Sequence, residues 1–217
     1  MSEKKRPYTM RKRARSQEET RQRIVEATMK LHEEIGPRAT TISAIAEEAG
    51  VQRLTVYRHF PDETAVFQAC TSHWLELNPP PDPGDWAGVA DPQARLRQAL
   101  GAFYDYYSRT RRMWTVSFRD VDEVPALQAP MAEVAAFLET VARGLVHALG
   151  PGARTAMTGP TIRHALHFLT WKDLEDQGLS ESEKLDLALA WVSGAARSGP
   201  GALPAPNPSR YAGGDSH

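Results

Sequence analysis

Apolar residues recur at helical spacing over most of the chain, and the clearest case lies between residues 41 and 60. A first group falls at i, i+3, i+4 and i+7 and comprises Ile42, Ile45, Ala46 and Ala49. Thr41 stands before this group and can cap a helix, and Gly50 follows it, where a left-handed residue commonly ends one. Val56 and Phe60 then mark the apolar side of a second short helix. Two short helices joined by a tight glycine turn are typical of a helix-turn-helix.

The second helix of this pair carries a polar side suited to DNA. Its outward residues are Gln52, Arg53, Thr55, Arg58 and His59. Gln and Arg side chains form bidentate hydrogen bonds with base edges, so Gln52 and Arg53 are candidate base-reading residues. Thr55, Tyr57 and His59 carry donors suited to phosphate oxygens. The alternative is a small helical pair whose polar side is only solvated.

A helix before this pair is expected over residues 18–35, ended by the Gly-Pro sequence that follows. Ser16 and Glu19 match a capping box at its start. Its apolar stripe should close a small three-helix core over the helix-turn-helix. His32 is expected on the solvated side of this helix.

A fourth helix is expected from Pro61 and Asp62 to about Leu77, with Cys70 on its apolar side. We expect Cys70 to be a small buried residue and not a reactive thiol. The proline-rich residues 78–83 cannot continue a helix and predict a loop.

The rest of the chain also has helical periodicity, which predicts an all-α body. Helices are expected at residues 92–109, 125–149, 154–176 and 181–196. Residues 112–121 predict a brief helix, although a strand also fits. The helix over residues 125–149 could begin at Pro125 or Pro130, and the helix over residues 154–176 could kink or restart at Gly159-Pro160. The last helix should start with a second capping box, Ser180 and Glu183.

Charge is distributed unevenly along the 217 residues, although the net charge is only −1. Residues 1–60 hold 13 Lys and Arg against eight acids, whereas the remainder holds 13 against 19. This asymmetry favours a nucleic-acid-binding N-terminal end. A single cysteine excludes an internal disulfide and suits a reducing cytoplasm. The charged N-terminus does not match a signal peptide, and no apolar run approaches a membrane span.

The first 15 residues contain seven Lys and Arg against one acid, Glu3. Such a dense run of like charge should not fold alone, so we expect a disordered arm over residues 1–17. One interpretation is a solubilising tail. The other is an arm that reaches phosphates or an adjacent minor groove.

The string T-x-x-x-I-A-x-x-A-G-V-x-x-x-T-V-Y-R-H-F-P, residues 41–61, closely resembles the DNA-binding segment of TetR-family transcriptional regulators. The resemblance runs from about Ile24 to Phe67 and fixes the Ala-Gly-Val turn and the Tyr-Arg-His-Phe end of the second helix. It implies that Gln52, Arg53 and Leu54 face bases. The residues that it places along the DNA backbone are Thr41, Ser43, Thr55, Tyr57 and His59.

Two positions depart from the family pattern. Leu54 stands where many relatives have Gly or another small residue, which allows contact with a thymine methyl group. Glu63 stands where relatives usually have a Lys that grips phosphate, so that grip is expected to be absent here.

A set of large side chains lies on the C-terminal helices that are expected to converge. The candidate ligand-binding residues are Phe103, Tyr104, Tyr107, Trp114, Phe118, Phe137, His164, His167, Phe168 and Trp171. Ligand cavities are mostly apolar with a few polar groups, and the family resemblance implies an inducer pocket in this part. An ordinary aromatic core is the alternative for each residue.

Sequence motifs give no support to catalysis or to a cofactor. His164 and His167 are three apart on a helix and could share a metal, but no further ligands stand at fixed spacing. Nucleophile-elbow, zinc-protease and phosphate-loop motifs do not occur, so we expect neither an enzyme nor a cofactor.

The resemblance therefore predicts a repressor that pairs through its last two helices and binds a palindromic operator as a homodimer. A small hydrophobic or aromatic effector would release it. We expect an arm over residues 1–17 and a helix-turn-helix domain over residues 18–62. An effector-binding and dimerisation domain should follow over residues 63–197, and a disordered tail over residues 198–217. A DNA binder without an effector, and an enzyme or carrier on a helical body, are the alternatives.

Overall fold

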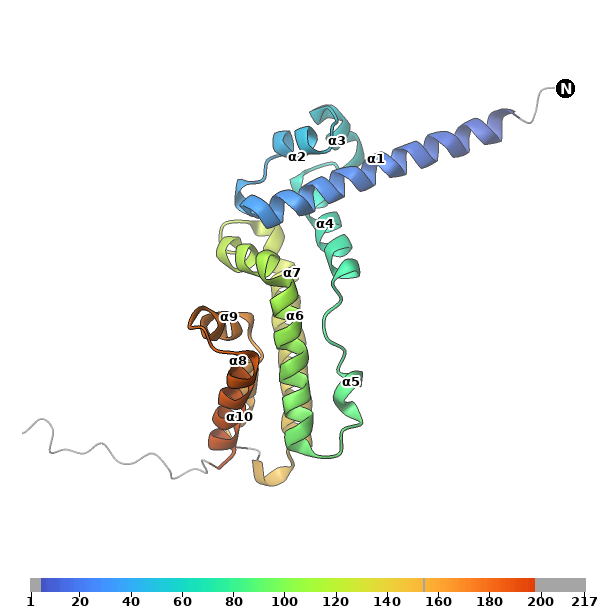
Figure 1. Cartoon of the computed structure of the whole chain (residues 1–217). Coiled ribbons are helices and arrows are strands. Elements are labelled where there is room, and N and C mark those ends of the chain that lie inside the picture. Colours follow the sequence, from blue (N-terminus) through green and yellow to red (C-terminus); the bar gives the residue numbers. More distant parts are fainter. Residues whose placement is uncertain (1–4, 154, 198–217) are drawn as a thin grey trace, which may run out of the picture. The chain divides into compact units, whose positions relative to one another are not determined.

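The computed structural model describes residues 5–153 and 155–197, with side chains from residue 10 onward. The described part is all-helical, as the sequence predicted (Figure 1). The α-helices are α1 (Lys5–Ile35), α2 (Ile42–Glu48), α3 (Arg53–His59), α4 (Glu63–Leu77), α5 (Gly84–Ala87), α6 (Pro92–Asp120), α7 (Pro125–Ala148), α8 (Thr158–Ala165), α9 (Phe168–Asp176) and α10 (Glu181–Arg197). Two 3-10 helices, η1 (Pro37–Ala39) and η2 (Pro151–Ala153), lie between them. The predicted tail, residues 198–217, lies outside the described residues.

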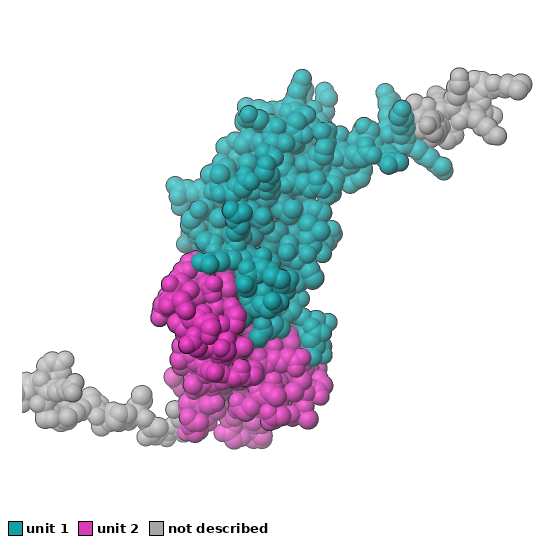
Figure 2. Space-filling model, in the orientation of Figure 1, with its two compact units in different colours: residues 1–85, 101–137 teal, residues 86–100, 138–217 magenta. Residues whose placement is uncertain are grey.

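The chain forms two compact units, which Figure 2 shows in different colours. Unit 1 contains residues 1–85 and 101–137, and unit 2 contains residues 86–100 and 138–217. Helices α6 and α7 each contribute residues to both units. None of the helices in the described ranges combines the length and the apolar character that a bilayer crossing requires.

The N-terminal core of unit 1 is built where α1, α2, α3 and α4 pack together. Its fully buried residues include Ile24, Ile45, Val56 and Val66, one from each helix. Phe60 completes the core at the end of α3, and the Arg21 guanidinium lies 5.0 Å from the centre of its ring. The apolar stripes that the sequence predicted therefore meet as expected.

The predicted start of the first helix was wrong. α1 begins at Lys5 and not near residue 18, so Ser16 and Glu19 lie inside the helix and form no capping box. The Thr20 hydroxyl donates to the Ser16 carbonyl (2.9 Å), and Arg15 pairs with Glu19 one turn later (3.0 Å). Lys, Arg, Met and Ala are good helix formers, and this local propensity extends the helix beyond its packed portion.

The prediction of a solvated His32 was also wrong. Its side chain is only 4% exposed, with its ring edge-on to Phe67 at 4.4 Å between centroids and Nδ1 3.6 Å from Cys70 Sγ. The residue lies on the side of α1 that α4 covers, so burial overrides its polarity. Burial lowers the pKa of His32 to about 4 and raises that of the buried Cys70 to about 12.

Residues 92–120 form one continuous helix, where the sequence predicted two separate elements. The junction at residues 110–112 contains neither Gly nor Pro. The hydroxyl of the buried Thr110 donates to the Tyr106 carbonyl (2.5 Å), so its polar group is satisfied within the helix. Of the two possible starts for the next helix, the structure uses Pro125, and Pro130 lies inside α7.

In unit 2 the predicted helix over residues 154–176 is broken into α8 and α9. The break falls at Leu166-His167, and the imidazole of His167 caps α9 by accepting from the Leu169 N–H (3.3 Å). Gly159-Pro160, where the sequence suggested a kink or a restart, lies in the first turn of α8, so a helix starts there. Proline is tolerated there because the first-turn N–H groups have no partner within the helix.

The capping box at the start of α10 is confirmed. The Ser180 N–H donates to Glu183 Oε2 (2.8 Å), and the Glu183 N–H donates weakly to Ser180 Oγ (3.4 Å). The next residue, Lys184, is fully buried and pairs with Glu175 and Glu181. α8 and α9 both pack against α10 within unit 2.

Candidate nucleic-acid interface

The turn between α2 and α3 is formed as the sequence predicted. The Ala44 N–H donates to Thr41 Oγ1 (3.2 Å), which caps α2. Gly50 has φ 64, a left-handed conformation that costs an L-residue roughly 1–2 kcal/mol. The Val51 N–H donates back to the Ala46 carbonyl (2.9 Å), which closes the turn before α3 begins at Arg53.

Helix α3 is fixed by its apolar side, and most of its polar side is exposed. Val56 is fully buried and Phe60 is 3% exposed, so the orientation of the helix is set by the core. On the other side Leu54 is 59% and Tyr57 44% exposed, so both large side chains face solvent. Arg53 and Arg58 are exposed beside them.

The structure places the nine candidate DNA-binding residues at the start of α2 and around α3. Seven are exposed: Thr41, Ser43, Gln52, Arg53, Leu54, Tyr57 and Arg58. Thr55 and His59 are half-buried. A short helix that presents charged, amide and apolar groups in this way has the dimensions and the chemistry to enter a major groove.

Residues 24–70 match the family model for bacterial regulatory proteins of the tetR family. This match identifies a TetR-type DNA-binding segment within the chain. A TetR-family signature in this segment coincides with α1 to α4, the helices that build and hold the turn.

Two curated relatives from Pseudomonas putida match part of the chain. The HTH-type transcriptional regulator SrpR is 43% identical over 36% of this chain and 40% of its own length. The uncharacterized HTH-type transcriptional regulator TtgW is 42% identical over 36% of this chain and 63% of its own length. The matches therefore cover less than two thirds of either relative.

Solved structures resemble most of the helical fold of this chain. A TetR-like transcriptional regulator from Rhodococcus sp. RHA1 has a TM-score of 0.59 and 18% identity, and the match covers 80% of this chain and 93% of that one. The regulator FadR from Bacillus subtilis, solved in complex with stearoyl-CoA, has a TM-score of 0.55 and 16% identity, with 80% and 98% coverage. These matches show the fold, including the C-terminal helices.

Sequence analysis missed a polar cluster that ties the end of α6 to the turn before α2. The carboxylate of Asp120, 2% exposed, accepts from the Arg119 guanidinium (2.6 Å) and from the Arg38 N–H (3.1 Å). Arg119 also donates to the Ile35 carbonyl (3.1 Å). The hydrogen bond from Arg119, together with that from Arg38, holds the pKa of Asp120 below its usual value. Helical periodicity gives no signal for a contact 82 residues apart, and only the tertiary fold brings these groups together.

Gly36 lies at the centre of this cluster. It has φ 93, and a Cβ built there would lie 1.9 Å from Arg119 Nη2 and 2.6 Å from Asp120 Oδ2. Glycine is therefore required both by the backbone conformation and by the closeness of the ion pair.

Six of the candidate ligand-binding residues lie in unit 1. They are Phe103, Tyr104, Tyr107, Trp114, Phe118 and Phe137. The rings of Phe103, Tyr107, Trp114 and Phe118 form a chain of contacts with centroids 6.0–6.2 Å apart. Burial raises the pKa of Tyr107 above its usual value, so its hydroxyl is a neutral polar group in an apolar cluster.

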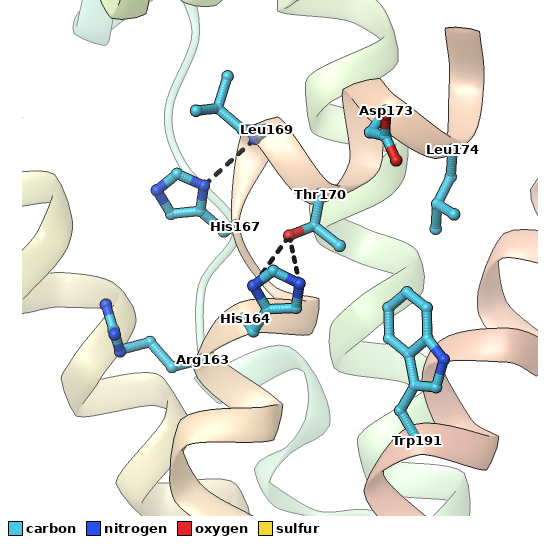
Figure 3. A pocket seen from close by; sticks show the side chains of 8 residues that line it. All are labelled: Arg163, His164, His167, Leu169, Thr170, Asp173, Leu174 and Trp191. Carbon is cyan, nitrogen blue, oxygen red and sulfur yellow. Dashed lines mark hydrogen bonds between the residues drawn. The ribbon is translucent and has the colours of Figure 1, made fainter. Parts of the chain in front are cut away.

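The other four candidates lie in unit 2, and the structure separates them by environment. Phe168 and Trp171 are buried, whereas His164 and His167 line an open cavity of about 520 Å³ (Figure 3). Trp191 and Thr170 line the same cavity, with the Thr170 hydroxyl 3.5 Å from the His164 ring nitrogens. Burial, with Arg163 and His164 nearby, lowers the pKa of His167.

The two histidines do not form part of a larger set of metal ligands. Within residues 5–153 and 155–197, no group of three or more His, Cys, Asp or Glu is placed to hold a metal ion. Nδ1 of His167 already accepts the capping hydrogen bond of α9.

Proposed function

We propose that the chain is a TetR-family transcriptional repressor that binds operator DNA in the cytoplasm through α3 and is released by a small effector. The observation that supports it most directly is the exposed side of α3. Arg53, Leu54 and Tyr57 project from a helix whose opposite side is fully buried. In a major groove the Arg53 guanidinium can donate to a guanine edge, and the Leu54 side chain can contact a thymine methyl group.

We propose that DNA is bound by two copies of the chain, paired through α10 and the preceding segment α8–α9. Symmetric dimers bind half-sites about one helical turn apart, roughly 34–36 Å, because both recognition helices must enter successive major grooves. The half-exposed Trp191 of α10 and the 47% exposed Leu169 of α9 suit an interface between copies.

The proposed effector is small and largely apolar or aromatic. The aromatic chain of unit 1, from Phe103 to Phe118, is largely buried and apolar, which supports an apolar or aromatic effector. FadR, whose fold is similar, was solved with stearoyl-CoA. The effector must bind the DNA-incompetent conformation more tightly than the competent one, or the equilibrium does not shift.

We further propose that α6 carries the effector signal to the DNA-binding helices. The aromatic chain lies on α6 between Phe103 and Phe118. The last two residues of the helix, Arg119 and Asp120, form hydrogen bonds with Ile35 and Arg38, which flank Gly36. A movement of α6 would therefore displace the turn that leads into α2. The two ends of this path belong to the same compact unit.

The proposal is tested by selecting bound sequences from a pool of random duplex DNA with the full chain. We expect enrichment of a site with two-fold symmetry. Thermal-shift screening against apolar and aromatic compounds then tests the effector, and a hit should weaken binding to the selected duplex. Failure to enrich any sequence contradicts DNA recognition, whereas enrichment without any stabilising compound favours a DNA binder that has no effector.

A further inference from the structure

The first turns of α1, residues 5–19, form a basic helical extension. Residues 10–19 are all exposed, and the first buried residue of α1 is Ile24. The extension carries Arg11, Lys12, Arg13 and Arg15 within five positions. At 1.5 Å per residue it is roughly 22 Å long, enough to follow several phosphates of a duplex.

The extension is electrostatically unfavourable by itself. α1 has no acidic residue in its first turn, so cations stand at the positive end of the helix dipole. Arg11 and Arg15 are also four residues apart, where like charges repel each other across one helical turn. Arg15 pairs with Glu19, but both side chains are exposed and such pairs contribute little. A polyanion placed beside these residues would remove the repulsion and stabilise the helix.

The same helix holds the DNA-reading elements, which fixes where the extension can act. Arg21 lies over Phe60 at the end of α3, and Arg23 donates to the Ala49 carbonyl at the end of α2 (3.3 Å). Figure 1 shows α1 continuing well beyond α2 and α3 without a break. The charges of the extension are therefore carried by a rigid element anchored to the recognition helix.

We infer that this extension is a second DNA-binding surface, which contacts phosphates outside the base pairs read by α3. The inference rests on the proposed function, because it needs α3 to be placed on a duplex. Lys and Arg suit phosphate oxygens and carry no base preference in this role. The extension would strengthen binding to every sequence and would leave the preferred sequence unchanged.

The test is the salt dependence of binding to the selected operator duplex. The variant R11Q/K12Q/R13Q/R15Q removes the four charges and keeps residues that favour a helix. A control, R109Q/R111Q/R112Q/R143Q, removes four exposed charges from α6 and α7. The slope of log K against log salt is negative. One lost phosphate contact per protomer reduces its magnitude by about 2 in a dimer, and four reduce it by about 7. We expect a decrease in this range for the extension variant, and the slope of the control should match that of the unaltered chain.

The outcomes separate the inference from the proposed function. If the unaltered chain binds no duplex, the proposed function is wrong and the inference falls with it. If the chain binds its selected duplex and the extension variant keeps the same slope, only the inference is overturned. Vesicles containing phosphatidylserine provide a second polyanion. A loss of vesicle binding without any change in DNA binding would assign the extension to a membrane surface and would also overturn the inference.

Discussion

At the residue scale, the side chains proposed to read bases have no packing role. Gln52, Arg53 and Leu54 are all exposed, and Gln52 makes no side-chain capping bond although it precedes α3. Thr55 and His59 are half-buried, which suits contacts with the DNA backbone beside the helix better than contacts with bases within the groove. The assignment of bases and phosphates to these residues stays a prediction that single substitutions can test.

Arg53→Ala should weaken binding to the selected duplex by about 1–3 kcal/mol and relax the preference at one base position. Thr55→Ala should weaken binding to all sequences alike, because phosphate contacts carry no sequence information. Competition binding with singly substituted duplexes measures both effects, with the exposed Arg109→Ala as a control. An Arg53→Ala variant with unchanged affinity and preference would mean that the assumed register of α3 is wrong.

His32 should make the stability of unit 1 depend on pH. Its pKa is about 4 in the folded chain against 6.5 for an unperturbed histidine, so the unfolded state binds more protons between these values. Stability therefore falls as the pH is lowered through this window, by about 2 kcal/mol between pH 7.5 and 5. The pKa of the nearby Asp120 is lowered, so the stability that its ionised carboxylate contributes is lost only at still lower pH.

The variant His32→Phe should abolish most of this pH dependence. It keeps a ring against Phe67, and it removes the buried Nε2, which makes no hydrogen bond in the described structure. Urea unfolding at pH 7.5 and at pH 5 gives the comparison, with substitution of the exposed His147 by Gln as the control. If His32→Phe and the unaltered chain lost the same stability between pH 7.5 and pH 5, the result would contradict a neutral, buried imidazole at His32.

At the scale of elements, local signals predicted the helix-turn-helix well because each end is marked by a particular residue. Thr41, Gly50 and Asp62 all have the capping or turn role that their types favour. The continuous α6 and the break before α9 were not predictable in this way. In α6 the Thr110 hydroxyl is satisfied by the Tyr106 carbonyl, so the helix continues through a buried polar residue. The break before α9 depends on His167 as the capping residue, and His is uncommon in that role.

The candidate site was likewise predicted only where its residues are close together in the sequence. The residues of α2 and α3 follow one another in the sequence, so helical spacing indicated their exposed side. The aromatic candidates are spread over more than 60 residues, and periodicity could not show that they divide between two units. The Asp120–Arg38 contact and the burial of His32 arise from long-range packing and left no sequence signal.

Two glycines with positive φ offer a matched pair of substitutions. Gly50→Ala should lower the free energy of unfolding by roughly 1–2 kcal/mol through backbone strain alone, because nothing lies within 4 Å of the added Cβ. Gly36→Ala should cost more, since the methyl group displaces the Arg119 guanidinium from the buried Asp120 carboxylate. Urea denaturation of both variants measures the difference. Equal losses would show that the Arg119–Asp120 pair does not hold the turn.

Glu63 offers a gain-of-binding experiment. It is exposed in the first turn of α4, where its charge favours the helix but would repel a phosphate. Glu63→Lys should tighten binding to selected and unrelated duplexes by similar factors and steepen the salt dependence. Substitution of the exposed Glu139 by Lys is the control, with the same change in net charge. An equal gain in both variants would mean that Glu63 does not face the duplex.

At the scale of the whole molecule, the proposed function requires two copies of α3 at a fixed spacing. One short helix reads only a few base pairs, whereas two copies on one duplex combine their contacts and demand a palindromic site. An effector needs to change only the spacing or tilt of the two helices to release the DNA. The path proposed for this change runs along α6 to the turn at Gly36.

The most direct test is sedimentation of a fluorescent operator duplex, taken from the random-pool selection, with increasing amounts of the purified chain in dilute buffer. We predict a complex of two protomers per duplex, and its loss when both half-sites are scrambled. A chain that sediments as a monomer and leaves the duplex free would contradict the central claim that paired copies of α3 read DNA.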